Sequence, residues 1–196
     1  MPDIIIKANE FSNLFLKEYL AKNPDKTLGF ELNLTIDLRE KLVGFASLFW
    51  KDIIGINDET LNEIYKAYEY LMIKGVENEN IVILVPSVKM GYMIVNFLSK
   101  QGFEVEHTFE KLAKENFDLQ SDKLKVSTIE SFKGLEMDAV IYVSDEQDNI
   151  KKDIETYIAI TRAKSYLIVF NQTAKYRSYG AKWHKLDDEF KATFGN

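Results

Sequence analysis

Two stretches of this chain decide its fold: STIESFKGLE at residues 127–136 and YIAITRAK at residues 157–164. The first is typical of a strand that ends in a polar loop containing a glycine. The second is typical of a helix that ends in Arg162, directly before another strand. Strands that alternate with helices at this spacing favour a mostly parallel sheet covered by helices on both faces.

The flanking sequence continues the alternation. Asn57-Asp58 is expected to cap a helix that runs to about Ile73 and is terminated by Gly75. Ser87 is expected to cap a helix that runs to Lys100, with Gly102 as its stop. The remaining pattern predicts strands at 3–7, 30–36, 81–85, 103–107, 124–128, 139–143 and 166–170, and helices at 10–22, 38–54, 151–162 and 182–193. In such sheets ligands bind beyond the carboxyl ends of the strands, and both informative stretches fall at strand or helix ends, where that rule expects function.

Composition restricts the class of protein. The 196 residues are 46% apolar and 29% charged, which fits one ordinary globular domain. No apolar run is long enough to cross a membrane, and residues 1–20 lack the features of a secretory leader. The absence of cysteine excludes disulfides and fits a cytoplasmic location. The net charge of −6 argues against tight autonomous binding to nucleic acid but allows a local binding patch.

The two stretches resemble the fifth and sixth motifs of superfamily 1 helicases of the UvrD/Rep type. In that family both motifs lie in the second of two RecA-like domains, which supplies half of an ATP site and half of a track for single-stranded nucleic acid. The resemblance implies an α/β fold like that of P-loop NTPases but without the phosphate loop. It divides the chain into a lead-in strand and helix at 1–33, a RecA-like domain at 34–171 and a tail with a helix at 172–196, all within one compact domain.

The resemblance assigns ATP-facing roles to four residues. Arg162 would be the arginine that stabilises charge on the transferred phosphoryl group. The alternative is that it bonds the free carbonyls at the C-terminus of its helix and interacts favourably with the helix dipole. Glu136 would bond the ribose of ATP, and Gly134 would let the backbone turn closely after the strand. The stretch LTIDLR at 34–39 resembles the family's fourth motif and makes Arg39 a second catalytic cation in the cleft, although Leu38 replaces the aromatic residue of that motif.

The resemblance also assigns contacts to nucleic acid. Thr128 and Ser131 would donate to backbone phosphates, and Ser87 with the first amides of its helix could receive another phosphate. The alternative is that Thr128 is an ordinary β-branched strand residue and that Ser131 is an ordinary turn residue. Three positions on this side depart from the family, namely Pro86, Val88 and Glu130, of which the last is a carboxylate that repels phosphate. The nucleotide side of the resemblance is therefore the better supported.

No phosphate-binding loop and no magnesium-binding Asp-Glu strand end occur in the sequence. ATP with Mg²⁺ would therefore be shared with a separate P-loop domain. The favoured hypothesis is the C-terminal motor domain of an ATP-dependent helicase, inactive alone, with an N-terminal P-loop domain in cis and single-stranded DNA or RNA as partner. A stand-alone protein that completes an ATPase site in trans is the second hypothesis. A degenerate helicase-like module that only binds a partner is the third.

Overall fold

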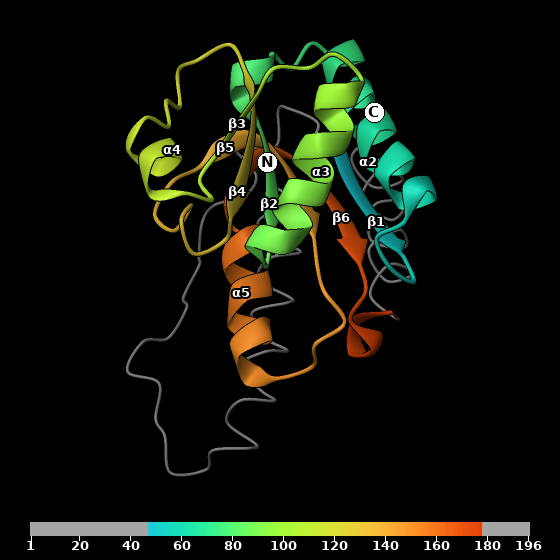
Figure 1. Ribbon diagram of the computed structural model, residues 1–196. Helices are drawn as coiled ribbons and strands as arrows, with labels where there is room; N and C mark the ends of the chain where they lie inside the picture. The colour runs from blue at the N-terminus through green and yellow to red at the C-terminus, as the bar shows by residue number, and fades with distance from the viewer. Residues whose placement is uncertain (1–46, 178–196) are drawn as a thin grey trace, which may run out of the picture.

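The computed structural model describes residues 47–177, which form one parallel α/β sheet (Figure 1). Its six described strands pair in parallel throughout. In spatial order they are β1 (Ser47–Asp52), β6 (Ala163–Asn171), β5 (Met137–Val143), β2 (Ile81–Val85), β4 (Leu124–Thr128) and β3 (Val105–His107). The predicted parallel sheet is therefore confirmed.

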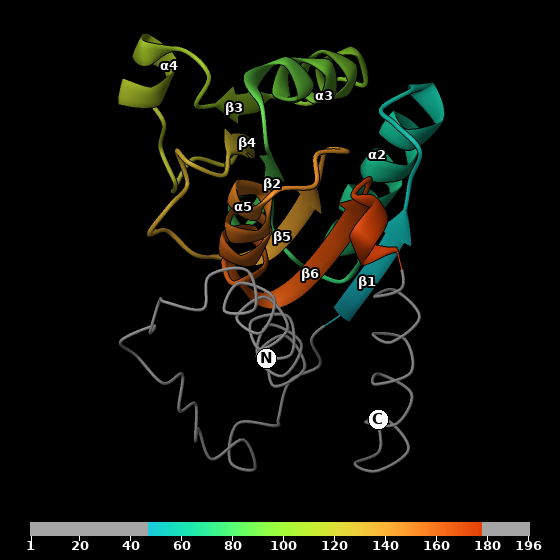
Figure 2. The ribbon, with the colours of Figure 1, turned by 90° about the horizontal axis from the view of Figure 1, so that it is seen from below.

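Helices cover both faces of the sheet, as expected (Figure 2). Helices α2 (Asp58–Ile73) and α3 (Val88–Lys100) pack on one face, and α5 (Ile150–Ile160) packs on the other. A short helix, α4 (Lys111–Glu115), lies between β3 and β4, and two short 3₁₀ turns, η1 (Asn78–Asn80) and η2 (Ala174–Tyr176), precede β2 and follow β6.

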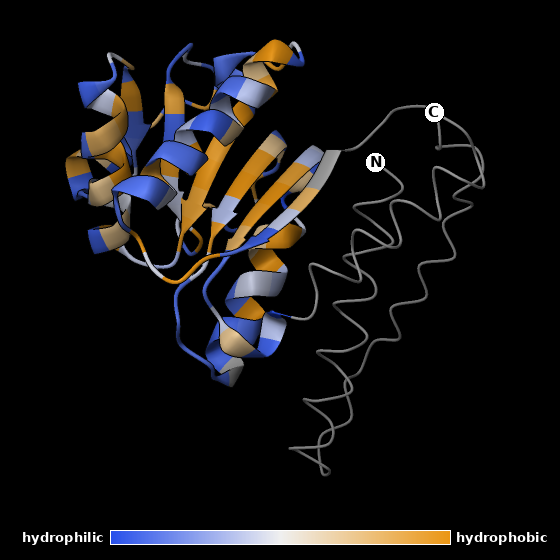
Figure 3. Ribbon diagram, turned by 90° about the vertical axis from the view of Figure 1, so that its right-hand side faces the viewer, coloured by the Kyte–Doolittle hydropathy of each residue, from blue (hydrophilic) through white to orange (hydrophobic). Residues whose placement is uncertain are grey.

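The central strands are buried on both faces. All five residues of β2 are fully buried, and alternate residues belong to different cores: Val82 and Leu84 face α5, while Ile83 faces α2 and α3. This arrangement explains why the strand is apolar at every position instead of alternating. Figure 3 shows the result as apolar strands beneath helices whose outer surfaces are polar.

The helix ends follow the capping residues that the sequence contains. The side chain of Asn57 accepts a hydrogen bond from the amide of Thr60, and that of Ser87 accepts from the amide of Met90 at 3.3 Å. Gly75 and Gly102 both have positive φ, of 82° and 92°, directly after their helices. The two helix boundaries expected at Asn57 and Ser87 are therefore confirmed.

One predicted element is wrong within the described residues. A helix was expected over 38–54, but residues 47–52 form strand β1. The exposures show the strand period, since Trp50 is 4% exposed and its neighbour Phe49 is 42% exposed. β1 pairs with β6, more than a hundred residues away, and this partner is invisible in the local pattern. The elements predicted over 3–7, 10–22, 30–36 and 182–193 lie outside the described residues.

Gly91 is a point of close approach between α3 and the segment after β3. A Cβ atom added to Gly91 would lie 2.0 Å from Cζ of Phe109. The same ring stacks on His107, with centroids 4.8 Å apart, and meets Tyr92 edge-on at 5.1 Å. The missing side chain of Gly91 therefore makes the room in which Phe109 is held.

Replacing Gly91 with alanine should destabilise the fold by about 1–3 kcal/mol, because the added methyl group must displace Phe109 from its two aromatic neighbours. This cost outweighs the helix propensity that alanine gains over glycine, about 1 kcal/mol. Urea unfolding measures the change. In a Phe109→Ala background the same substitution should instead be stabilising, and destabilisation of equal size in both backgrounds would contradict the proposed clash.

Candidate functional site

The carboxyl end of the sheet, where the strands finish, brings three of the predicted residues together. Thr128 is the last residue of β4 and pairs with Val85, the last residue of β2. Ser87 follows β2 by two residues, and Ser131 lies in the turn after β4. All three line a pocket of about 390 Å³, termed here the switch-point pocket. Its walls come from residues 86–88, 108–111, Lys114, residues 128–131, Lys151 and Glu155.

The topology explains why a pocket forms at this place. The connection from β2 through α3 leads towards β3 on one side of the sheet, whereas the connection from β5 through α5 leads towards β6 on the other. β2 and β5 are neighbours, so the two chains part at their carboxyl ends. Such a switch point is the usual ligand position in an open parallel sheet.

The hydroxyl groups of the pocket make local bonds that leave donors available. Thr128 Oγ1 accepts from the amide of Ser131 at 3.3 Å, and Ser87 Oγ accepts from the amide of Met90. Because each hydroxyl also carries a proton, both can still donate to an anion. Behind them, the buried hydroxyls of Thr108 and Ser127 bond each other at 2.9 Å and support the end of β4.

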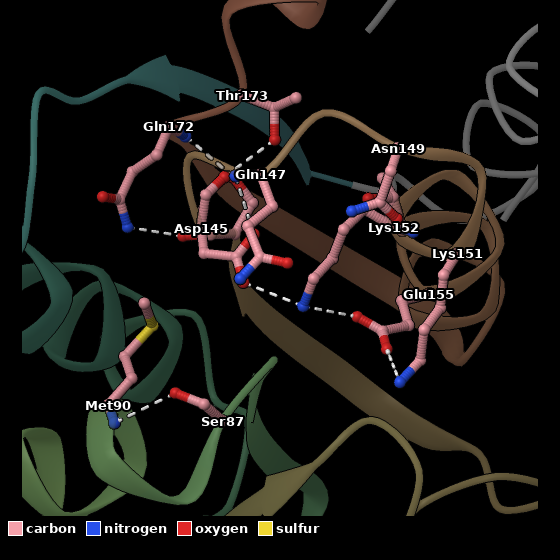
Figure 4. A network of polar contacts seen from close by, with 12 residues as sticks. Ser87, Met90, Asp145, Gln147, Asn149, Lys151, Lys152, Glu155, Gln172 and Thr173 are labelled. Carbon is pink, nitrogen blue, oxygen red and sulfur yellow. Dashed lines mark hydrogen bonds and ion pairs between the residues drawn. The ribbon is translucent and has the colours of Figure 1, made fainter.

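The neighbouring half of the carboxyl end is closed by polar contacts (Figure 4). Gln172 donates from its backbone to Ser144 Oγ at 2.7 Å and from its side chain to the Ser144 carbonyl at 2.5 Å. Thr173 Oγ1 donates to the carbonyl of Asp145 at 2.8 Å. These bonds join the ends of β5 and β6, so the open part of this end lies at β2 and β4.

Charges of both signs line the switch-point pocket: three lysines, which are Lys111, Lys114 and Lys151, and three glutamates, which are Glu110, Glu130 and Glu155. Glu155 is held by Lys152, which also contacts Asp145, each at 2.8 Å. Burial alone would lower the pKa of Lys152, but these two carboxylates outweigh it and raise the pKa. Lys152 therefore stays charged and offsets Glu155.

The other three described candidates lie at the opposite end of the sheet. Met137 begins β5 and its amide donates to the carbonyl of Arg162 at 2.9 Å, so Glu136 and Arg162 immediately precede two paired strands. Gly134 lies two residues earlier in the same loop. All three lie at strand or helix ends, as expected, but at the amino ends of β5 and β6 and not beyond a carboxyl end. The crossover from β4 carries the chain to the amino end before β5 starts.

The guanidinium group of Arg162 is fixed by three hydrogen bonds. It donates to the carbonyls of Ile158 at 3.2 Å and Leu135 at 3.3 Å, and to Thr161 Oγ1 at 3.0 Å. An arginine has five N–H donors, so two remain for a ligand. Arg162 therefore bonds a carbonyl at the end of its own helix, which is the alternative role considered from the sequence. Its bond to Leu135 also holds the side chain against the loop that carries Glu136.

Glu136 is exposed and has no hydrogen-bond or ion-pair partner among residues 47–177. Gly134 has φ of +89°, in the left-handed region, and a Cβ there would meet no atom within 4 Å. Glycine is therefore required at this position for its backbone conformation, as the sequence suggested, and not because a side chain would lack space. Arg39, the second predicted cation, lies outside the described residues.

The sequence reasoning missed part of the pocket wall. Phe109, Lys111 and Lys114 follow β3 and line the switch-point pocket, but no helix was expected at α4. The signal available in the sequence was a phenylalanine followed closely by two lysines. Residues 47–177 contain no group of three or more His, Asp or Glu side chains that could hold a metal ion. In the same range, no helix is both long and apolar enough to cross a membrane.

Two comparisons with known proteins found similarity to helicase domains. Residues 86–171 match the family model of the viral superfamily 1 RNA helicase core domain. No curated protein matches the chain. The C-terminal domain of a possible DNA helicase from Lactobacillus plantarum WCFS1 superposes with a TM-score of 0.51 at 16% identity, over 66% of this chain and 75% of that one.

A second solved structure, Xpd4 of S. tokodaii, covers 72% of this chain and 37% of that one at 11% identity. Its TM-score of 0.37 is too low to support an argument. The match to the helicase C-terminal domain shows the fold alone. Together with the parallel sheet it identifies a RecA-like α/β fold.

Substituting Gly134 with alanine should lower the free energy of unfolding by about 1–2 kcal/mol, because an alanine pays that cost in the left-handed region. Asparagine, which tolerates this region, should cost less. Urea unfolding checks both variants. Gly55→Ala is the matched control, since Gly55 has neither a positive φ nor a neighbour within 4 Å of an added Cβ. Equal losses at Gly55 and Gly134 would contradict the assignment.

Proposed function

We propose that this chain is the second RecA-like domain of an ATP-dependent helicase or translocase of superfamily 1, of the UvrD/Rep type. The amino end of the sheet would face ATP bound by a P-loop domain absent from this chain, and the carboxyl end would form part of a single-stranded nucleic-acid track. One observation carries the proposal: the candidate residues divide between the two ends according to their expected ligand. Gly134, Glu136 and Arg162 share one end, whereas Ser87, Thr128 and Ser131 share the other.

Two properties of Arg162 support the ATP-side role. Its planar group cannot lose its charge, and its two remaining donors can hold two phosphate oxygens. The bonds to Ile158 and Leu135 fix the side chain before any ligand arrives, which reduces the entropy lost on binding. Arg39 is proposed as the second cation of the same cleft. ATP would supply the phosphoryl group, and Mg²⁺ would be held by ligands outside this chain.

Glu136 is proposed to bond the ribose hydroxyls of the same nucleotide. Its carboxylate is exposed and unengaged within residues 47–177, so it can accept bonds without giving up an existing partner. Because Glu136 precedes Met137, whose amide bonds the Arg162 carbonyl, the ribose and phosphate contacts would lie at the starts of the adjacent strands β5 and β6.

The carboxyl end is proposed to contact the backbone of a single strand through the hydroxyls of Ser87, Thr128 and Ser131. Such contacts position a strand without reading its sequence. Glu130 lines the same pocket and reduces its attraction for phosphate. The affinity of this end alone should therefore be modest and should depend on a second domain.

The two alternatives differ in what completes the ATP site. A stand-alone protein would form a stable complex with a separately encoded P-loop subunit and hydrolyse ATP only in the mixture. A non-catalytic module would show no ATP dependence in any complex. The ATP-linked functions are supported by the exposed carboxylate of Glu136, which has no partner among residues 47–177, and by the two donors that remain on Arg162 after its bonds at the helix end.

Arg162→Ala should reduce kcat for ATP hydrolysis by roughly a thousandfold or more in the protein that includes the P-loop domain, in cis or in trans. Arg162→Lys should also be strongly impaired, because lysine lacks the planar fork. Steady-state turnover at saturating ATP and nucleic acid measures both. Arg177→Ala, at an exposed arginine, is the control and should retain activity. Unchanged turnover in a folded Arg162→Ala protein would refute the assignment.

Glu136→Ala should remove discrimination between ATP and 2′-deoxyATP. The unmodified protein should show a lower KM for ATP, because its carboxylate accepts from the 2′-hydroxyl, and the variant, which has no acceptor at this position, should treat both nucleotides alike. Bonds to charged groups contribute about 1.5–3 kcal/mol, so the KM ratio should be on the order of tenfold or more. Asp138→Ala, two residues away, is the control. Equal discrimination in Glu136→Ala and the unmodified protein would exclude the ribose contact.

A further inference from the structure

Phe109 is an aromatic residue held at the wall of the switch-point pocket. It is half-buried, and its ring contacts three neighbours: it stacks on His107 at an interplanar angle of 9°, meets Tyr92 edge-on and points its tip at Gly91. It is nevertheless one of the residues that line the pocket. A ring fixed by neighbours and open to a polar pocket is a prepared stacking surface, because little side-chain freedom remains to be lost.

Two lysines accompany this ring. Lys111 and Lys114 lie on α4, directly after Phe109, and line the same pocket. Lys114 has no ion-pair partner among residues 47–177, and Lys111 reaches Glu115 only at 3.9 Å with both side chains mostly exposed. An exposed pair of this kind contributes little, so both ammonium groups are available to a phosphate.

The carboxylates of the pocket limit what the lysines can contribute. Glu110 accepts from the hydroxyl of Tyr92 at 2.5 Å, Glu155 is offset by Lys152, and Glu130 has no described partner. Lysines and glutamates line the pocket in equal number. Phosphate attraction alone is therefore weak here, and a base contact would supply a large share of the affinity.

We infer that the switch-point pocket is a nucleotide-sized subsite in which a base stacks on Phe109 while backbone phosphates bind Lys111 and Lys114. The ligand class is single-stranded nucleic acid, read without base-specific hydrogen bonds. This inference rests on the proposed track and adds three residues that lie outside the stretches 34–39, 127–136 and 157–164. The volume of about 390 Å³ is within the range of small-ligand sites.

The base contact is tested with two fluorescent strands of equal charge, a twelve-residue oligothymidylate and a twelve-residue abasic strand, bound to the full chain in low salt. The unmodified chain should bind the thymidylate at least about fivefold more tightly, since each stacked base contributes on that scale. Phe109→Leu should lose this preference while binding the abasic strand as before. Phe97→Leu, at a half-buried phenylalanine of α3 that does not line the pocket, should keep it.

The phosphate contact is tested by the salt dependence of thymidylate binding. Lys111→Gln/Lys114→Gln should reduce the slope of log K against log salt by about 1.4, the value for two single-strand phosphate contacts. Phe109→Leu should leave the slope unchanged. Lys66→Gln/Lys100→Gln removes equal charge from α2 and from the far end of α3, and should change the slope less. Because Lys111 and Lys114 are exposed, this variant should fold even if Phe109→Leu does not.

The outcomes separate the subsite from the proposed function. If the unmodified chain prefers thymidylate and Phe109→Leu keeps that preference, the subsite is wrong and the track stands. If the lysine variant keeps the full slope, the phosphate part of the inference is also wrong. If the unmodified chain binds neither strand at any salt concentration, the subsite is excluded, whereas the track is not, because its affinity depends on a second domain. Loss of the preference together with the reduced slope would support the subsite.

Discussion

The arrangement of both candidate sites depends on the burial of Phe132 and Ile129 in the short crossover between β4 and β5. The connection between two parallel strands of one sheet usually takes a dozen or more residues, often a helix, because the chain must return to the starting end of the sheet. Here residues 129–136 make the return without a regular helix, passing β2, which lies between the two strands. Ile129 is 2% exposed, Phe132 is fully buried, and the amide of Ile129 bonds the carbonyl of Val85. This apolar anchoring fixes Thr128 and Ser131 at one end of the sheet and Gly134 and Glu136 at the other.

The carboxyl end shows how side chains decide which part of a switch point remains open. Ser144, Gln172 and Thr173 join the ends of β5 and β6 through three hydrogen bonds, which engage the polar groups at this part of the sheet. The ends of β2 and β4 carry small hydroxyl residues instead, and the pocket lies there. The topology thus determines where two connections part, while the local polar contacts determine how much of that gap a ligand can use.

The sequence predicted those features whose causes are local. Strand β2 is apolar at every position because both of its faces are buried. Helices α2 and α3 begin directly after Asn57 and Ser87 because those side chains accept from the amides of Thr60 and Met90. β1 was missed because its partner strand is distant in sequence, and because the apolar residues Leu42, Phe45, Ala46 and Phe49 have the spacing of a helix. The site was predicted only in part for the same reason. Thr128, Glu136 and Arg162 stand in recognisable stretches, but Phe109 reaches the pocket only through the space left by Gly91. Nor does spacing reveal that Thr128 and Glu136 lie at opposite ends.

Since one uninterrupted peptide segment connects the two ends, the crossover is also a potential route of energetic communication. Its outer parts bear the candidate contacts, and its middle is anchored by Phe132. If a ligand at Gly134 displaced Phe132 from the core, the turn at Thr128 would have to adjust, because the amide of Phe132 bonds the carbonyl of Thr128. Thermodynamic linkage is reciprocal, so nucleic acid at one end would alter nucleotide affinity at the other by the same factor. In a domain of the proposed kind, these eight residues would be where a coupling energy between the two ligands is set.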